Sequence, residues 1–229
     1  MKLEEWKRVL VFGAHVDDEV LGPGATIARL ADLGAEVTVV TFTGGKDTGY
    51  ALPEWKDKIT EMRKQEAAAA DRILGVKERV YLGHPVQEVP NDGPTYRECV
   101  RIIRELKPDV IFTHWFEDKH RDHRAVSAVT DEARWKAWDH VLADLGAPYW
   151  TPQLYYYELL ELFPHPSIIV DVTDTIERKV AAMEQMPTQL RVLPRSPEFI
   201  RALGAARGYL RDRPYAEAFL ASNLMSTAL

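Results

Sequence analysis

The feature that most constrains the fold is the alternation, in the first half of the chain, of short β-branched runs with longer segments of helical period. The runs typical of buried strands are RVLVFG (8–13), EVTVVTF (36–42), RVYLG (79–83) and DVIFTH (109–114). The segments with helical period are GATIARLADLG (24–34), ITEMRKQEAAAADRILG (59–75) and TYRECVRIIRELK (95–107). This alternation is typical of βαβ units, and it predicts an α/β fold with a Rossmann-like, doubly wound, mostly parallel sheet flanked by helices.

The second half of the chain departs from this regular alternation. A Trp-rich helical segment (124–146) leads to strand-like QLYYYEL (153–159) and SIIVDV (167–172), and two further helical segments follow. The Pro-rich stretches between these segments are short enough to be connections within one unit. We therefore expect a single domain over residues 1–229, with extra C-terminal strands and helices added to the Rossmann-like core.

Composition excludes several classes of protein. With 29 basic against 35 acidic residues the chain carries a net charge of −6, so no overall positive field recruits a nucleic acid. The apolar run near the N-terminus is too short for a membrane span or for the apolar core of a signal peptide, which favours a cytoplasmic protein without a membrane span. Cys99 is the single cysteine, and we interpret it as a packed thiol without a catalytic role.

Polar side chains follow three of the four predicted strands, and ligands of open parallel sheets bind beyond the carboxyl ends of strands. These segments are AHVDDE (14–19), TGGKDTG (43–49) and THWFEDKHRDH (113–123). If the strand order is 3-2-1-4, the first and fourth strands are neighbours, and His15 and Asp18 meet one histidine of HRDH. Two histidines and one carboxylate satisfy the ligand count of a catalytic zinc, which keeps one position open for water. Asp17 would then be free to accept a proton from that water.

Each of these groups also has a purely structural interpretation. A histidine at a strand end can be a solvated or hydrogen-bonded loop residue, and acidic residues before a helix can cap it, which is the role expected for Glu19. The GPG at 22–24 is no dinucleotide fingerprint, because Ile27 stands where the third glycine belongs. TGGKDTG lacks the spacing of a P-loop, so we interpret it as a flexible substrate loop, with phosphate binding as the weaker alternative. The coincidence of two polar sets at one sheet edge favours the metal site.

The chain resembles the LmbE/PIG-L family, whose AHPDDE motif precedes a Gly-rich helix start. The matching segments are AHVDDEVLGPGATIARLADLGAEVTVVTFTGG (14–45), MRKQEAAAADRILGV (62–76) with the family's R-x-x-E-A pattern, THWFEDKHRDH (113–123) with its D-x-H-x-D-H pattern, and the C-terminal RGYLRDRPYAEAF (207–219). The resemblance implies a zinc-dependent N-deacetylase that acts on an N-acetylglucosamine conjugate or oligosaccharide. It implies Zn²⁺ as the cofactor, with another divalent metal as the alternative, and a homo-oligomer of three or six subunits.

The resemblance also assigns residues to roles. His15, Asp18 and His123 correspond to the metal ligands, and Asp17 corresponds to the general base. His120 would stabilise the oxyanion or help to protonate the leaving amine.

Two further assignments come from the same comparison. Asp122 would orient His120. Arg63 matches an arginine that points into the substrate pocket; the alternative is a solvated helix residue that pairs with Glu66.

The chain departs from the family pattern at two places. Val16 replaces the proline of AHPDDE, which removes a rigid φ but no ligating group. MPTQ (186–189) replaces a His-Ser-Gln stretch, so a substrate contact from that histidine is absent. Trp115, Tyr156 and Tyr157 could stack on a sugar, but a core position is the favoured interpretation. Two other functions stay open: a non-catalytic metal- or sugar-binding protein, and a metal-dependent amidase for a non-sugar conjugate.

Overall fold

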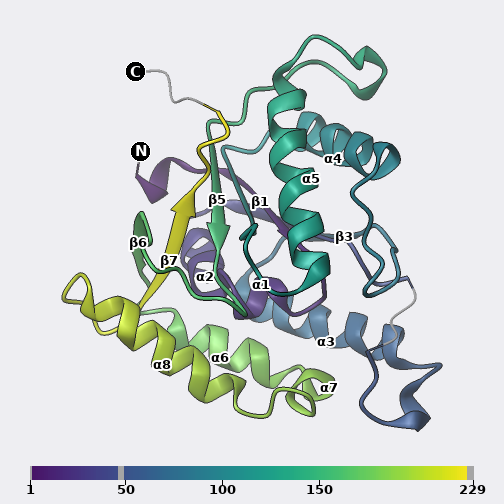
Figure 1. Cartoon of the computed structure of the whole chain (residues 1–229). Coiled ribbons are helices and arrows are strands. Elements are labelled where there is room, and N and C mark those ends of the chain that lie inside the picture. Colours follow the sequence, from purple (N-terminus) through teal and green to yellow (C-terminus); the bar gives the residue numbers. More distant parts are fainter. Residues whose placement is uncertain (1, 46–48, 226–229) are drawn as a thin grey trace.

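The computed structural model describes residues 2–45 and 49–225, and the strands of this part form one seven-stranded sheet (Figure 1). The strands are β1 (Arg8–Gly13), β2 (Glu36–Thr41), β3 (Glu78–Tyr81), β4 (Val110–His114), β5 (Gln153–Tyr157), β6 (Ile168–Asp171) and β7 (Ala216–Ala221). Their order is β3-β2-β1-β4-β5-β7-β6. Strands β1 to β5 pair in parallel, whereas β7 is antiparallel to both β5 and β6.

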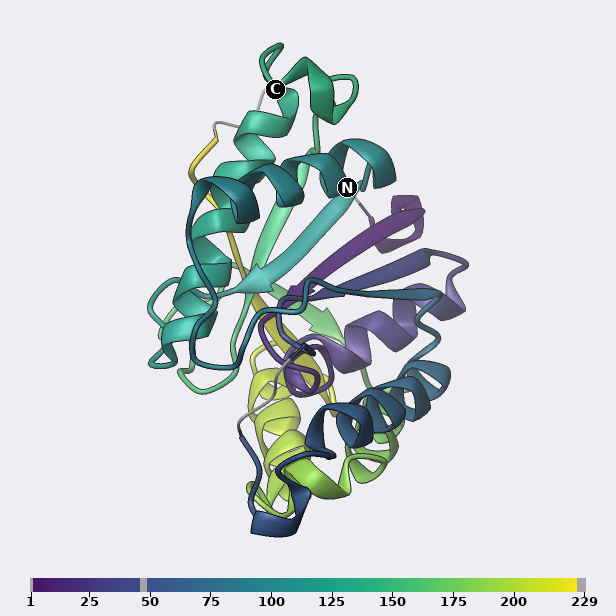
Figure 2. The same cartoon turned by 90° about the vertical axis from the view of Figure 1, so that its right-hand side faces the viewer.

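Helices cover both faces of the sheet, as the side view makes clear (Figure 2). They are α1 (Asp18–Leu21), α2 (Gly24–Asp32), α3 (Ile59–Leu74), α4 (Gly93–Leu106), α5 (Arg121–Trp138), α6 (Ile176–Glu184), α7 (Pro187–Leu190) and α8 (Ser196–Tyr209), with 3₁₀ turns at Leu3–Glu5, Pro53–Trp55 and Ala143–Leu145. In β1, Val9 and Val11 belong to the core beneath α2, α3 and α6, while Leu10 and Phe12 belong to the core beneath α4 and α5. Burial of both faces explains why the strands are almost continuously apolar.

The sequence predicts the parallel half of this fold well. The four predicted strands are present with small shifts at their ends, the order 3-2-1-4 is confirmed, and the mostly parallel sheet flanked by helices is confirmed. Cys99 is buried, and so are Trp115, Tyr156 and Tyr157, which confirms their interpretation as core residues. In the part of the chain that the structure describes, no helix has the length and apolar character needed to cross a membrane.

The prediction of one helix over 124–146 is wrong, because α5 ends at Trp138. The cause lies on α4, where the buried Arg104 guanidinium donates hydrogen bonds to the carbonyl oxygens of Ala137, Asp139 and Leu142 at 3.1, 2.7 and 2.6 Å. These carbonyls turn toward one cation, so the chain wraps around it instead of continuing the helix.

The C-terminal strand is a second difference from the prediction. Residues 216–221 form β7, although AEAFLA contains three alanines, which favour strands only weakly. The strand exists because it pairs with β5 on one side and β6 on the other, a tertiary effect that local sequence does not carry. In addition, the described part of the chain has three α-helices rather than two after β6, because Pro187 begins the separate short helix α7.

Candidate active site

The turn between β1 and α1 presents His15, Asp17 and Asp18 at the carboxyl edge of the sheet. Asp18 closes this turn, since its Oδ2 accepts the backbone N–H of His15 at 2.7 Å. The same oxygen lies 2.9 Å from Nε2 of His114, the last residue of the neighbouring strand β4. Both contacts engage Oδ2, and the second carboxylate oxygen, Oδ1, remains for another partner.

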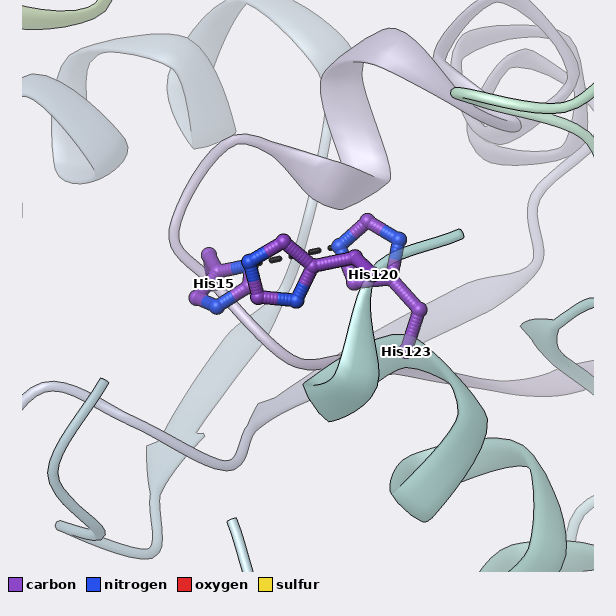
Figure 3. Close-up of side chains that lie close together, drawn as sticks. All are labelled: His15, His120 and His123. Carbon is purple, nitrogen blue, oxygen red and sulfur yellow. Dashed lines mark hydrogen bonds between the residues drawn. The ribbon is translucent and has the colours of Figure 1, made fainter. Parts of the chain in front are cut away.

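The start of α5 brings two more histidines to this edge, His120 as the N-cap and His123 in the first turn (Figure 3). His123 Nε2 lies 3.3 Å from His15 Nδ1 and 3.3 Å from Asp18 Oδ1, and His15 Nδ1 lies 3.5 Å from the Asp18 carboxylate. Tetrahedral zinc with bonds of about 2.0–2.2 Å separates its ligand atoms by roughly 3.3–3.6 Å. The donor types and spacings of these three residues therefore fit a divalent metal.

Two buried carboxylates contact His15 and His123 at the ring nitrogen that lies away from the proposed metal position. Asp122 Oδ2 lies 3.0 Å from His15 Nε2 and accepts the backbone N–H of Gln87 at 2.7 Å. Asp118 Oδ1 lies 3.1 Å from His123 Nδ1. A carboxylate on the far nitrogen of an imidazole fixes the ring orientation and leaves the near nitrogen for a metal. Both rings are arranged in this way.

The position of Asp122 differs from the role that the family resemblance implies. Its carboxylate contacts His15 rather than His120, and only its backbone N–H reaches His120, donating to Nδ1 at 3.1 Å. The reason is that His120 caps α5, so its ring faces the free N–H groups of the helix instead of the Asp122 carboxylate. Because Nδ1 accepts, the proton of a neutral His120 is assigned to Nε2.

Two residues of the site have no assigned role in the sequence analysis, Asp118 and His114. Both side chains are almost fully buried. The signal for Asp118 was present, since it is the first acid of the D-x-H-x-D-H pattern. His114 gave none, because the last residue of an apolar strand is readily interpreted as core.

Other candidate sets of donors share the same residues. Ligand atoms also lie close together in the set His15, His120 and His123, and in the set Asp18, His114 and His123. His123 is common to both, so the described residues converge on one centre rather than on two.

A pocket of about 280 Å³ opens above this centre. His15, Asp18 and His123 line it together with Asp17, with His120 at the start of α5, and with residues from three other segments: Arg63 on α3, Gln87 before α4, and Gln189 on α7. Gly49 also lines it, while residues 46–48 of the predicted substrate loop lie outside the described residues.

The interpretation of Arg63 as a solvated helix residue that pairs with Glu66 is wrong. Arg63 is buried in the pocket wall, where its Nη2 donates to the carbonyl of Gly49 at 2.8 Å. Glu66 does not pair with it, because the Glu66 carboxylate accepts the backbone N–H of Thr188 at 3.0 Å and the Thr188 hydroxyl at 2.5 Å. Glu19 lies in the first turn of α1, as expected of an acid that complements the helix dipole, but it makes no N-cap hydrogen bond. It is fully buried and accepts a hydrogen bond from Arg79 of β3 at 2.7 Å.

The environment changes the acidity of two pocket residues. Burial raises the pKa of Asp17, and the adjacent Asp18 charge raises it further, against the opposing effects of His15 and Arg63. Burial lowers the pKa of His120, and the neighbouring His15 and His123 lower it further. The pocket therefore combines a carboxylate made more basic than usual with an imidazole that stays neutral.

Comparison with known proteins agrees with this geometry. Residues 10–134, more than half of the chain, match the PIG-L model, described as GlcNAc-PI de-N-acetylase. The chain belongs to the PIG-L family of de-N-acetylases.

Individual relatives are amide hydrolases by name. The chain is 27% identical over 248 residues to 1D-myo-inositol 2-acetamido-2-deoxy-alpha-D-glucopyranoside deacetylase of Rhodococcus erythropolis, with 84% of each protein covered. It is 31% identical over 179 residues to deacetylase 1 of the same type from Catenulispora acidiphila, where the match covers 63% of this chain and about half, 55%, of that protein. In structure it is similar to N,N'-diacetylchitobiose deacetylase from Pyrococcus horikoshii, with a TM-score of 0.87, 26% identity, and 96% and 85% of the two chains covered.

Proposed function

We propose that this chain is a zinc-dependent hydrolase that removes the acetyl group from an N-acetylated amino sugar, an N-acetylglucosamine conjugate or oligosaccharide. The observation that carries the proposal is the convergence of His15, Asp18 and His123 at the base of a pocket that Asp17 also lines. His123 Nε2 lies 3.3 Å from both His15 Nδ1 and Asp18 Oδ1, and the other Asp18 oxygen, Oδ2, lies 3.5 Å from His15 Nδ1. The deacetylases named above support the amino sugar as the substrate class.

The three donors would hold the metal, with Asp122 and Asp118 as the carboxylates that orient the two histidines. When bound, zinc supplies Lewis acidity, which polarises a carbonyl group and lets water be deprotonated near neutral pH. His114 serves as a support, because its ring is fully buried and contacts Asp18 and the backbone N–H of Ala14, at 3.1 Å, rather than the pocket.

Asp17 takes the proton from the attacking water. Its raised pKa suits this step, since a more basic carboxylate is a better proton acceptor. The acetamide C–N bond then breaks, acetate forms, and the amine leaves with the proton that Asp17 took from the water.

His120 and Arg63 act on the substrate. The Nε2–H of His120 is a donor for the acetamide oxygen, on which negative charge develops during attack. Arg63 lines the pocket, where its guanidinium would donate a hydrogen bond to a hydroxyl oxygen of the sugar.

Acetate release tests this proposal. The chain is treated with a chelator, resupplied with Zn²⁺, Co²⁺ or Mg²⁺, and given N-acetylglucosamine glycosides, N,N'-diacetylchitobiose and non-sugar N-acetyl amides. We expect acetate from the sugars after zinc is returned and little from the other amides. Release from the non-sugar amides alone would instead identify the amidase, and metal binding without release from any substrate would identify the non-catalytic protein.

A further inference from the structure

An apolar trough of about 520 Å³ adjoins the catalytic pocket. The two cavities share a wall that includes Leu21, Leu160 and Leu193. Beyond this wall the trough continues along Leu162, Pro194 and Phe199, which do not line the catalytic pocket. Anything that fills the catalytic pocket and extends past the shared leucines therefore enters the trough.

The trough exposes more apolar surface than folding requires. Leu162 is 45% exposed, Val192 52%, and Leu193 and Phe199 38% each, although all four surround one concave surface. Grouped apolar exposure of this kind marks a binding surface, whereas scattered apolar side chains do not.

The walls of the trough are mainly aliphatic. Among the described residues that line it, Phe199 is the one aromatic side chain, and the polar residues are Arg195 and Ser196. Ser196 already donates its hydroxyl hydrogen to the Leu193 carbonyl at 2.8 Å, so the trough offers few hydrogen bonds. Such a surface suits a flexible hydrocarbon chain better than a second sugar, which needs polar partners and aromatic faces.

We propose that the amino-sugar substrate carries an alkyl chain in its aglycone, and that this chain lies in the trough while the acetamide lies over the metal site. The proposal rests on the deacetylase function proposed above and names the substrate class of the same site. Continuity of the two cavities at the shared leucines is what assigns the trough to the substrate.

The test compares methyl and octyl 2-acetamido-2-deoxy-β-D-glucopyranoside, with the octyl compound kept below its micelle-forming concentration. Full burial of one methylene changes an equilibrium about fourfold, and half burial about twofold. Seven half-buried methylenes therefore raise kcat/KM for the octyl glycoside about a hundredfold over the methyl glycoside. Equal values of kcat/KM for the two compounds would overturn the proposal. Absence of acetate from both would instead refute the deacetylase function.

A matched pair of variants locates the effect. Leu162→Glu places a charge in the trough outside the catalytic pocket, so we expect the octyl preference to fall below about tenfold while the methyl glycoside is deacetylated as before. Leu210→Glu is the control, because Leu210 is similarly exposed, at 49%, and is not part of the trough. It should keep the full preference.

A second copy of the chain is the other occupant to exclude. Sedimentation of the parent and of Leu162→Glu decides this point. A parent oligomer that dissociates in Leu162→Glu, together with equal kcat/KM for the two glycosides, would identify the trough as a subunit interface and overturn the proposal.

Discussion

Two sites in the molecule, the Lys179–Glu217 pair and the pocket around His15, bury charged side chains in different ways. In the C-terminal half, Lys179 Nζ donates to Glu217 Oε1 at 2.7 Å and to the Gly22 carbonyl at 2.6 Å. At the proposed metal site, by contrast, the facing atoms of His15, Asp18 and His123 are the atoms that would bind a cation. Against the opposing effect of burial, the Asp18 carboxylate raises the pKa of His15 to about 10 and that of His123 to about 9, so without a metal the histidines carry the positive charge that faces Asp18. The Lys179–Glu217 pair is a fixed ion pair, whereas the histidine cluster can release its protons in exchange for a metal.

The Lys179–Glu217 pair stabilises the start of helix α2. Helix α2 begins after Pro23, which has no polar side chain to cap it. Glu217 supplies the cap from β7, because its carboxylate accepts the N–H of Ala25 at 3.0 Å and that of Thr26 at 2.7 Å. We refer to Lys179 and Glu217 as the clamp. The comparison implies that changes at the metal site cost activity, whereas changes in the clamp cost stability.

The largest effect is expected when a proposed metal ligand is removed. Alanine in place of His15, Asp18 or His123 should abolish stoichiometric zinc and lower kcat/KM by roughly a thousandfold or more, since the metal contributes several kcal/mol of transition-state stabilisation. His15→Ala and His123→Ala should unfold near the temperature of the chelator-treated parent, because the clamp is intact. Asp18→Ala should unfold at a lower temperature, because it also removes the acceptor for the buried N–H of His15.

Metal analysis and thermal unfolding check this prediction, with His120→Ala as the control. That variant should keep near-parental zinc and lose roughly a hundredfold in turnover, the scale of a deleted oxyanion donor. Loss of zinc in His120→Ala, with retention in His15→Ala, would show that the histidines are assigned the wrong way round.

Asp17→Asn separates catalysis from metal binding, because it removes the proposed base and none of the proposed metal ligands. The amide keeps the size of the carboxylate but accepts no proton, so a loss of roughly 10² to 10⁴ in kcat is expected with zinc still bound. In the parent, activity falls as the pH drops through the pKa of Asp17, which lies above its ordinary value. The variant should lose this acidic limb of the profile, and an unchanged limb with full activity would place the base elsewhere.

Changes in the clamp should lower stability and leave activity unchanged, the reverse of the effect expected for Asp17→Asn. Glu217→Ala leaves the buried Lys179 without its partner and α2 without its cap, so we expect a loss of about 3–5 kcal/mol in the free energy of unfolding. Glu217→Gln keeps one acceptor and should lose less. Zinc content and kcat at low temperature should stay near the parental values in both, as denaturant unfolding and metal analysis can determine. A Glu217→Ala protein of full stability would contradict the structural role of the clamp.

The same contrast explains what the sequence could predict. His15 and Asp18 stand three residues apart, and His123 follows the next strand of the sheet, so local pattern and sheet topology suffice to bring them together. Glu217 reaches helix α2 across about 190 residues, and no local pattern encodes that contact. Arg104 ends α5 by a tertiary contact of the same kind, and β7 exists only through its neighbours. Asp118 was missed for a different reason, because a motif shows which residue recurs and not which atom it contacts.

Glu66 combines features of both regions, and the smallest effect is expected there. Its buried carboxylate holds Thr188 on α7, and the next residue, Gln189, lines the pocket. Glu66→Ala leaves the Thr188 N–H without an acceptor and should cost about 1–3 kcal/mol in the free energy of unfolding. It should also raise KM more than it lowers kcat, because Gln189 would lose its support. Glu61→Ala, on the exposed side of the same helix, is the control and should change neither quantity.

The pH dependence of stability separates the charge of Glu66 from its hydrogen bonds. Burial raises the pKa of Glu66 in the folded state, against the opposing effect of the Thr188 hydrogen bonds. The folded protein therefore favours the neutral acid, and this contribution to stability is fully present below the unfolded pKa of about 4.3 and is lost as the pH rises through the folded pKa. Glu66→Gln stays neutral and keeps one acceptor and one donor for Thr188. Its free energy of unfolding should match that of the parent at low pH and exceed it, by less than about 1 kcal/mol, above the folded pKa. Denaturant unfolding of both proteins across this pH range gives the difference directly. A parent that gains stability relative to Glu66→Gln as the pH rises would mean that the Thr188 hydrogen bonds outweigh burial, and that the carboxylate is retained for its charge.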